Sequence, residues 1–397
     1  MKTPRDKWCL PARHRASWLQ LALASGLVFW QGFMEEGGRK MRTKLSVLLF
    51  CVFVVSGLSV AQAQNVTITP LGSQEGEFCA GDRALLFQDP TGVRILTAPG
   101  RTVNGSTDPR LANPSDPSGG VHVVLIDHPH ADHIGDIFFS NCAGTTTAPF
   151  KFPAAGNTPE LVSGQNSVLP VGGEMGSFFT QKIKDVSGTA PVSCPVMPTG
   201  ANNVITVPRT APCVATLRGG TVTVTFAGQS KGVRITTIPA WHAAGAPPMF
   251  VDSPGIAPGL TGYQGSETGY IIRFTNGLTV LWTGDSGLIS DWATDREFYK
   301  PNLAVIHSDG LFTMSVGEAV FAVDHLIRPV TVIPEHLNQV STLGGMVVPG
   351  TRLEAFINEE HHANIMLPLS GMPISCDGEG NCTGAGAIHR VDDHDHR

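Results

Sequence analysis

The sequence predicts a mixed α/β fold, on three observations. Short apolar runs recur along the chain, and most of them end in a polar turn. Two segments instead carry the signature of a capped helix start, a Ser or Thr followed three residues later by Glu. With 45 Gly and 29 Pro in 397 residues, turns must be frequent. The hydrophobic fraction of 42% is enough for a large core in one or two domains.

Residues 41–63 have the form of a secretory signal peptide. Met41–Lys44 is a short basic start, residues 45–60 are apolar, and Ala61-Gln62-Ala63 is a small-x-small cleavage site. The apolar run is short for a membrane span and ends in small and polar residues, so we expect no stable membrane anchor. The expected location is therefore periplasmic or secreted.

Residues 1–40 come before that signal. Their last part, Glu35–Lys40, is what a purine-rich ribosome-binding sequence would give if it were translated. We interpret residues 1–40 as a mis-called N-terminal extension, with an extended signal peptide as the alternative. A peptide from this range in the mass spectrum of the expressed precursor would contradict the first interpretation.

Charge and cysteine content narrow the class of protein. The net charge is −6, and residues 1–63 are basic, so the rest of the chain is more acidic still. Nucleic-acid binding, which needs a basic surface, is not expected. An even number of cysteines in an exported chain suggests disulfides. Six cysteines allow 15 pairings, among which the short Gly-rich loop favours Cys376 with Cys382; the six are Cys79, Cys142, Cys194, Cys213, Cys376 and Cys382.

The first half of the remaining chain is predicted to be mostly strands. These cover residues 66–71, 84–87, 93–97 and 121–126, with a loop at 101–120.

Residues of about 143–230 are rich in Thr, Gly, Pro, Val and Ser and poor in charge. We interpret them as an insertion that covers one side of the site. Phe178 and Phe179 are a candidate substrate wall, with packing inside the insertion as the alternative.

The second half alternates strands and helices. A hairpin is predicted across Asn276-Gly277, a strong turn signal. Ser315 with Glu318, and Thr351 with Glu354, mark the starts of two helices. The predicted ranges are strands at 233–238, 269–275, 278–282, 303–306, 331–333 and 365–367, helices at 315–327 and 351–361, and a polar C-terminal tail at 376–397.

The densest group of polar side chains is His128-Pro129-His130-Ala131-Asp132-His133, directly after a predicted buried strand. Four polar side chains so close at a strand's end could not all be satisfied by ordinary packing. A metal ion accounts for them, because imidazole and carboxylate are its usual ligands. Further along the chain His242, Asp285, His307 and His336 each follow a β-like run, where rigid scaffolds present functional groups.

The group at 128–133, followed in order by His242, Asp285 and His336, resembles the metallo-β-lactamase-fold superfamily of metal-dependent hydrolases. The resemblance implies an αββα sandwich, two mixed β-sheets flanked by helices, over residues 64–375. It implies two divalent metal ions, zinc above all, with manganese or iron as alternatives. The first ion would be held by His128, His130 and His242, the second by Asp132, His133 and His336, and Asp285 would bridge the two.

The resemblance also implies a mechanism, in which a hydroxide between the two metals attacks the substrate. Asp132 is a candidate catalytic residue that binds metal and orients this hydroxide. His307, at a strand end, is a candidate catalytic residue that reaches the substrate, with ordinary packing or surface exposure as an equally favoured alternative. A structural metal site is the less favoured reading, since four ligands close such a site and seven candidates are present.

Within the superfamily, the second half resembles the L-ascorbate-6-phosphate-lactonase-like branch. The residues that carry this are Trp282–Leu288, Lys300–Val305, Phe312–Met314 and Val332–His336. β-Lactamases of this fold usually follow the third His with Thr-x-Gly, whereas His242 is followed by Ala-Ala-Gly.

We therefore expect a hydrolase that opens a small ester, above all a lactone, with acyl-homoserine lactones as one candidate. The alternatives are a phosphodiesterase or phospholipase-D-like enzyme, a β-lactamase, and a metal-dependent binding protein without catalysis. The partner is a small molecule, and the sequence does not set the oligomeric state.

Overall fold

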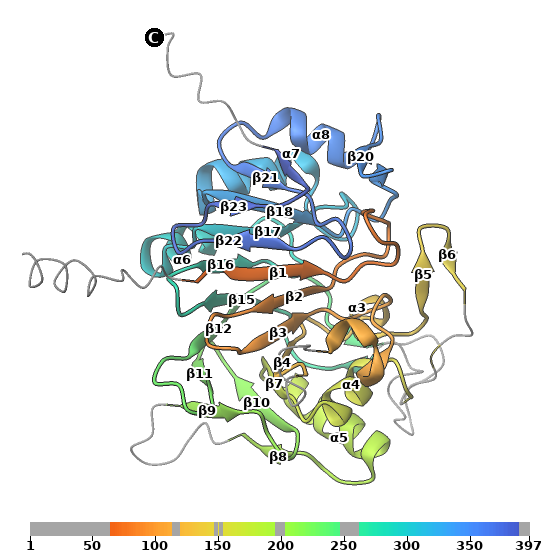
Figure 1. The fold of residues 1–397 in the computed structure, drawn as a ribbon, viewed down its shortest axis with the longest axis vertical. Coiled ribbons are helices and arrows are strands. Elements are labelled where there is room, and N and C mark those ends of the chain that lie inside the picture. The colour runs from red at the N-terminus through yellow and green to blue at the C-terminus, as the bar shows by residue number, and fades with distance from the viewer. Residues whose placement is uncertain are drawn as a thin grey trace, which may run out of the picture. The chain divides into compact units, whose positions relative to one another are not determined.

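The computed structural model describes residues 64–112, 120–146, 150, 154–194, 203–246 and 262–388. The expectations for residues 1–63, the signal peptide included, lie outside the described residues. Two large sheets face each other, and helices cover the outer face of each, so the predicted αββα sandwich is confirmed (Figure 1). Within the described ranges, each helix is too short or too polar to cross a membrane.

The first sheet contains nine strands, in the order β23-β22-β1-β2-β3-β4-β7-β10-β8. Its centre is formed by β3 and β4, which run parallel and end next to the His cluster. The strands are β1 (Val66–Pro70), β2 (Leu85–Gln88), β3 (Arg94–Thr97), β4 (Val123–Leu125), β7 (Val168–Gly172), β8 (Val192–Ser193), β10 (Cys213–Leu217), β22 (Ile374–Cys376) and β23 (Cys382–Thr383).

The second sheet also contains nine strands, in the order β24-β21-β18-β17-β16-β15-β12-β11-β9. The hairpin predicted at Asn276-Gly277 is present between β15 and β16. The strands are β9 (Val204–Val207), β11 (Thr221–Phe226), β12 (Val233–Pro239), β15 (Thr268–Arg273), β16 (Thr279–Trp282), β17 (Leu303–His307), β18 (Thr331–Glu335), β21 (Asn364–Met366) and β24 (Ala387–Ile388).

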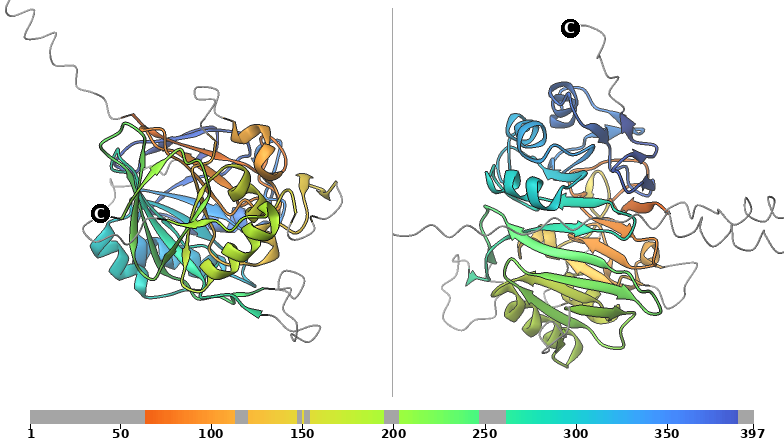
Figure 2. Two further views of the ribbon diagram at one scale, coloured as in Figure 1. Left: turned by 90° about the horizontal axis from the view of Figure 1, so that it is seen from below. Right: turned by 90° about the vertical axis from the view of Figure 1, so that its left-hand side faces the viewer.

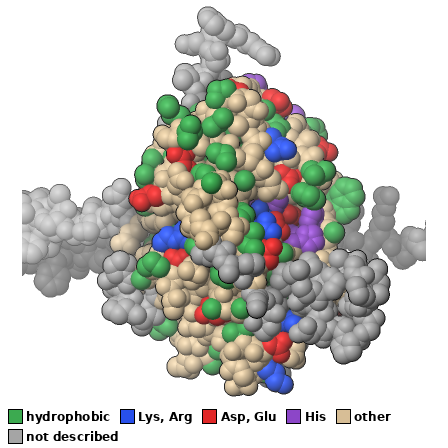
Figure 3. All heavy atoms as spheres, turned by 90° about the vertical axis from the view of Figure 1, so that its right-hand side faces the viewer, with side chains coloured by type: hydrophobic (Ala, Val, Ile, Leu, Met, Phe, Trp, Pro, Cys, Tyr) green, Lys and Arg blue, Asp and Glu red, His purple; other side chains and the backbone are tan. Residues whose placement is uncertain are grey.

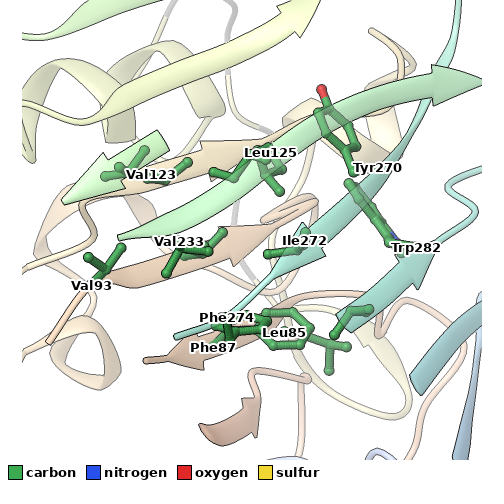
Figure 4. Packing of buried hydrophobic residues seen from close by; sticks show 14 of the residues in the cluster. Leu85, Phe87, Val93, Val123, Leu125, Val233, Tyr270, Ile272, Phe274 and Trp282 are labelled. Atoms are coloured by element: carbon green, nitrogen blue, oxygen red, sulfur yellow. The ribbon is translucent and has the colours of Figure 1, made fainter. Parts of the chain in front are cut away.

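The main core lies between the two sheets, where alternate side chains of each strand point inward (Figure 4). Phe87 of the first sheet stacks on Phe274 of the second, with ring centroids 5.6 Å apart. Tyr270 stacks on Trp282 at the same separation, and its hydroxyl donates to the carbonyl oxygen of Ile126, 2.8 Å away. This last bond ties the second sheet to the turn that carries the His cluster.

Helices bury one apolar face each against the outer sides of the sheets (Figure 2). Both predicted N-caps are confirmed, because Ser315 and Thr351 accept hydrogen bonds from Glu318 N and Glu354 N. The first predicted helix changes to a π-helical turn after Phe321. The elements are α4 (Thr158–Gly164) and α5 (Met175–Ser187) on the first sheet, and α6 (Asp291–Tyr299), α7 (Val316–Phe321), the π-helix Ala322–Ile327 and α8 (Arg352–Glu359) on the second.

Several shorter elements lie outside the two large sheets. A four-residue helix, α3 (Ala131–Ile134), contains the end of the His cluster, and two 3₁₀ turns lie at Gly105–Thr107 and Pro109–Leu111. The short hairpins are β5 (Phe139–Asn141) with β6 (Gly144–Thr145), β13 (Gly245–Ala246) with β14 (Gly262–Tyr263), and β19 (Thr342–Leu343) with β20 (Met346–Val347).

The interpretation of residues 143–230 as an insertion that covers the site was wrong for the described part. This segment supplies β7, β8 and β10 to the first sheet and β9 and β11 to the second. Its low charge and high Val and Thr content reflect strands that are buried in the sandwich. Phe178 and Phe179 are buried in α5 against the first sheet, so they pack in a core and do not form a substrate wall.

The interpretation of residues 376–397 as a polar tail was wrong up to residue 388. Cys376 and Cys382 belong to β22 and β23, which extend the first sheet, and β24 extends the second. The predicted disulfide between these two cysteines is present. Two further disulfides, Cys79–Cys142 and Cys194–Cys213, contain the other cysteines of the described residues.

Candidate metal centre

The candidate metal ligands come from four strand ends at one edge of the sandwich. The His cluster follows β4 in the first sheet, whereas His242, Asp285 and His336 follow β12, β16 and β18 in the second. Strands β16, β17 and β18 are parallel, and β12 runs in the same direction because two antiparallel pairings separate it from β16. Their C-terminal ends therefore meet at one edge, which brings together residues up to 208 positions apart in the sequence, His128 and His336.

The first ligand group is formed by His128, His130 and His242, whose ring nitrogens lie within 4.8 Å of one another. His130 Nδ1 and His242 Nε2 are 3.4 Å apart. Two nitrogens at about 2.1 Å from one tetrahedral ion are separated by roughly this distance. The geometry therefore suits a zinc-like ion at this group.

The second ligand group is formed by Asp132, His133 and His336, again with ligand atoms within 4.8 Å. Asp285 lies between the two groups. Its Oδ2 is 3.2 Å from His133 Nε2 and 3.3 Å from His336 Nε2, and 3.7 Å from His242 Nε2 in the first group. A single carboxylate oxygen thus faces both groups.

The pKa values of two of the histidines and of Asp285 fit ligands of a cation. Burial and the neighbouring His128 and His242 lower the pKa of His130 to about 4, and burial with the nearby Arg83 lowers the pKa of His336 to about 4. Both rings are therefore neutral at pH 7, as metal binding requires. Burial opposes the ionisation of Asp285, but His336 and His133 outweigh it and hold its pKa well below the usual range.

Two buried ring nitrogens further support a cation. His128 Nε2 and His336 Nε2 have no hydrogen-bond partner among the described residues. A buried polar atom without a partner is costly, and metal coordination would remove that cost. The residues present therefore fit a metal centre.

Asp127 contacts one histidine of each ligand group, and the sequence interpretation did not assign it a role. Its Oδ1 is 2.8 Å from His133 Nδ1, and its Oδ2 is 3.1 Å from His128 Nδ1. The same Oδ2 accepts from the backbone N–H of Asp285, 2.7 Å away. Metal-binding imidazoles characteristically donate their other nitrogen to such a carboxylate. A carboxylate directly before the first His of the cluster was the available signal.

Gly284 allows this contact with Asp127. Its φ is +57°, and a Cβ there would lie 2.5 Å from Asp127 Cβ. Glycine is therefore needed for both its backbone conformation and its lack of a side chain. It lets the loop after β16 bring Asp285 against the turn after β4.

The expectation that His307 reaches the substrate was wrong, because its side chain is fully buried. Its Nδ1 is 2.7 Å from Asp285 Oδ1, and its Nε2 accepts from Trp282 Nε1 at 3.2 Å. Glu335 Oε2 lies 3.3 Å from the same Nε2. His307 ends β17, and all five residues of this strand are buried. It therefore positions Asp285 from the protein interior.

Asp309 and Asn338 contact the Nδ1 atom of His336, and sequence reasoning missed both residues. Asp309 Oδ1 accepts from the backbone N–H groups of Leu311, Phe312 and Thr313, while its Oδ2 accepts from Asn338 Nδ2 at 2.5 Å. Both His336 and Asn338 adopt φ near +51°, a conformation uncommon for residues other than glycine. The Asp309 loop therefore fixes the strained turn that aims His336.

A buried arginine also contacts the second group. Arg83, in the loop before β2, donates from Nη1 to Asp132 Oδ2 and lies 3.0 Å from His133 Nε2. Its Nη2 donates to Asn338 Oδ1 at 3.4 Å. No pattern in the sequence marked this residue, because its contacts join loops that are far apart along the chain.

The centre opens on one face of the molecule. Histidine side chains are visible there together with acidic and basic side chains, and hydrophobic side chains lie near them (Figure 3). Asp132 is 25% exposed, whereas His128, His133 and His336 are buried. Trp241 is 70% exposed beside His242, and Phe312 is 60% exposed on the Asp309 loop. A substrate entering here would meet Asp132 and an apolar rim.

The sandwich and the His/Asp cluster at its edge define a metal-dependent hydrolase of the metallo-β-lactamase superfamily. The chain belongs to the UPF0173 metal-dependent hydrolase family. It is 30% identical over 308 residues to a member from Cupriavidus taiwanensis, with 75% of this chain and 88% of the relative covered. It is 29% identical over 265 residues to a member from Cupriavidus necator, with 67% and 74% covered.

Two further comparisons add context. No protein-family model matches the chain. Among solved structures, the metallo hydrolase Igni18 from Ignicoccus hospitalis superposes with a TM-score of 0.47 at 20% identity, covering 79% of this chain and 99% of that one. The expected similarity to the L-ascorbate-6-phosphate-lactonase-like branch stays a prediction.

Proposed function

We propose that this chain is an exported dinuclear metal hydrolase that opens a small ester, above all a lactone. The observation that carries the two-metal part is the position of Asp285 Oδ2, which faces His133 and His336 on one side and His242 on the other. Two divalent ions held by these residues would lower the pKa of a bound water and polarise the carbonyl oxygen of the substrate. Zinc suits the set of five imidazoles and two carboxylates, with manganese or iron as alternatives.

The chain's own residues divide the remaining work. Asp132 is the partly exposed carboxylate of the centre, so it is placed to take a proton from the attacking water and to pass it to the leaving oxygen. Asp127 and His307 are buried and hold the ligands from behind. Preorganised groups of this kind aid catalysis because they need no rearrangement during the reaction.

The character of the rim favours an uncharged ester with apolar parts. Trp241 and Phe312 present exposed apolar surface, whereas Arg83, the cation nearest the ligands, is only 2% exposed. A phosphodiester would call for accessible cations at the entrance. A lactone with an acyl chain, such as an acyl-homoserine lactone, would place its ring at the metals and its chain along the rim.

The test is a screen of the purified, metal-loaded protein against lactones, phosphodiesters and β-lactams, beside Asp132→Ala. We expect lactone turnover and a loss of at least about 100-fold in kcat for the variant. Asp136→Ala is the matched control: Asp136 lies four residues further on and pairs with Arg101 at 2.6 Å, away from the ligands. Equal activity of Asp132→Ala and the parent would overturn the role of Asp132. Two bound metals without turnover of any substrate class would favour a binding protein.

Export is supported by the three disulfides, since such bonds persist in oxidising compartments. With cleavage after Ala63, the mature protein would begin at Gln64. N-terminal sequencing of the protein from a periplasmic or culture fraction tests this proposal. A cytoplasmic protein that retains residues 41–63 would contradict it.

A further inference from the structure

Arg83 is unusual because a permanently charged guanidinium is buried among residues that would bind a cation. It is 2% exposed, and burying such a charge is costly unless it is paired. Its Nη1 contacts Asp132 Oδ2 and His133 Nε2, which are two of the atoms available to the second ion. Arg83 therefore already supplies a positive charge at this group.

His133 Nε2 shows why the contact matters. Asp127 Oδ1 lies 2.8 Å from His133 Nδ1 and so fixes the orientation of the ring. The other ring nitrogen, Nε2, then faces Arg83 Nη1, 3.0 Å away. A metal ion that binds Nε2 must take the place that this guanidinium group occupies.

The first ligand group differs in this respect. Within the described residues, Arg83 makes no hydrogen bond to His128, His130 or His242. Binding an ion at this group displaces no protein cation. The two groups share Asp285, but only the second contains a competing charge.

We propose that Arg83 is a built-in cation that competes with the second metal ion, so that the two ions bind in sequence, the first tightly and the second weakly. When the second ion is absent, the guanidinium holds Asp132 and His133 in place. When that ion binds, Arg83 gives up His133 Nε2 and keeps its partners Asp132 and Asn338. Occupancy of the second group, and with it activity, then follows the concentration of free divalent ion. This inference rests on the proposed function only in requiring two metal groups.

The test is a titration of the metal-free protein with Co²⁺, followed by its visible absorbance and by calorimetry. The wild type should bind two ions with affinities at least tenfold apart. Arg83→Met, which removes the charge and the donors but keeps the length, should tighten the second ion tenfold or more and leave the first within twofold. Arg83→Lys, which keeps the charge, should leave the second ion weaker than in Arg83→Met. Arg101→Met is the control, because Arg101 is paired with Asp136 and contacts none of the ligand atoms.

The unchanged first binding step shows that a variant is folded. If Arg83→Met does not fold, the test uses the wild type and Arg83→Lys. The proposal then requires that both proteins bind the second ion at least tenfold more weakly than the first. Three results would overturn the proposal. The wild type could bind two ions with equal affinity, the wild type and Arg83→Met could each bind a single ion, or the second ion could bind to Arg83→Met no more tightly than to the wild type. A tightened second step without hydrolysis of any substrate would support the role of Arg83 while contradicting the proposed function.

Discussion

Asp127 Oδ1 lies 2.8 Å from His133 Nδ1, and neither side chain is exposed to solvent. The carboxylate thereby orients the ring and fixes the nitrogen that faces the metal centre. We predict that Asp127→Asn lowers metal affinity about 10–100-fold, as expected for the loss of a carboxylate that supports a metal-binding histidine. Competition with a chromogenic chelator measures this. Asp89→Asn is the control, because Asp89 is equally buried but bonds Thr91 and Thr275. Equal metal affinity of both variants would contradict the role of Asp127.

His307→Gln tests the supporting position of His307. The change removes the ring between Asp285 and Trp282 and leaves buried polar atoms with poorer partners, so we expect a loss of about 1–3 kcal/mol in unfolding free energy. Because His307 is buried, kcat should fall while KM stays near its original value. Urea denaturation and steady-state kinetics give both quantities. A raised KM at unchanged stability would restore a direct role in substrate binding.

Gly284→Ala tests whether the close packing of Gly284 against Asp127 matters beyond the backbone strain at this position. The added Cβ would lie 2.5 Å from Asp127 Cβ at a φ of +57°, so we expect destabilisation of about 1–3 kcal/mol and weaker metal binding. Gly228→Ala is the matched control, since φ there is +83° but nothing lies within 4 Å of the added atom. The control should lose stability alone. Thermal denaturation with and without zinc distinguishes the two, and identical shifts would show that the contact with Asp127 is unimportant.

Glu360, which lies away from the metal centre, is expected to make the stability of the protein depend on pH. Burial, with Asp324 as a lesser cause, raises its pKa from 4.5 to about 7. The folded state therefore binds this proton more tightly than the unfolded state, so stability falls as the pH rises from about 4.5 to 7. Glu360→Gln should remove this dependence and stabilise the protein by roughly 1–3 kcal/mol above pH 7. Urea denaturation at pH 5 and pH 8 measures it, with the exposed neighbour Glu359→Gln as control. A variant that is no more stable at pH 8 than the wild type would contradict the assignment.

The disulfides are expected to contribute unequally. Cys79–Cys142 closes 63 residues, whereas Cys376–Cys382 closes 6. Constraint of the unfolded chain grows with loop length, which gives about 4 kcal/mol for the first bond and about 2 kcal/mol for the second. Paired Cys→Ala variants, compared by chemical denaturation, test the order. A larger loss on removing the short bridge would contradict it.

The sequence was informative where one local pattern determines one structural feature. The N-caps at Ser315 and Thr351 and the turn at Asn276-Gly277 are local, and all three are present. The order of the candidate ligands along the chain predicted the αββα arrangement through resemblance, and the structure brings those seven side chains together.

The parts that sequence reasoning missed depend on contacts between distant segments. Arg83 contacts Asp132, 49 positions away in the sequence, and Asn338, 255 positions away, and no local pattern marks such contacts. The assignment of residues 143–230 to an insertion had a different cause. Short β-rich runs have the same local pattern whether they form an insertion or strands of the main sheets. His307 was assigned to the substrate since a strand end does not reveal on which side of the ligands its side chain lies.

The strand β1 lies between β2 and β22, so one of its two neighbours in the first sheet comes from the far end of the described chain. The second sheet likewise receives its edge strand β24 from that end. During synthesis, both sheets therefore stay incomplete until almost the whole chain has emerged. The strand order thus places the completion of both sheets after the last candidate ligand, His336, in the order of synthesis.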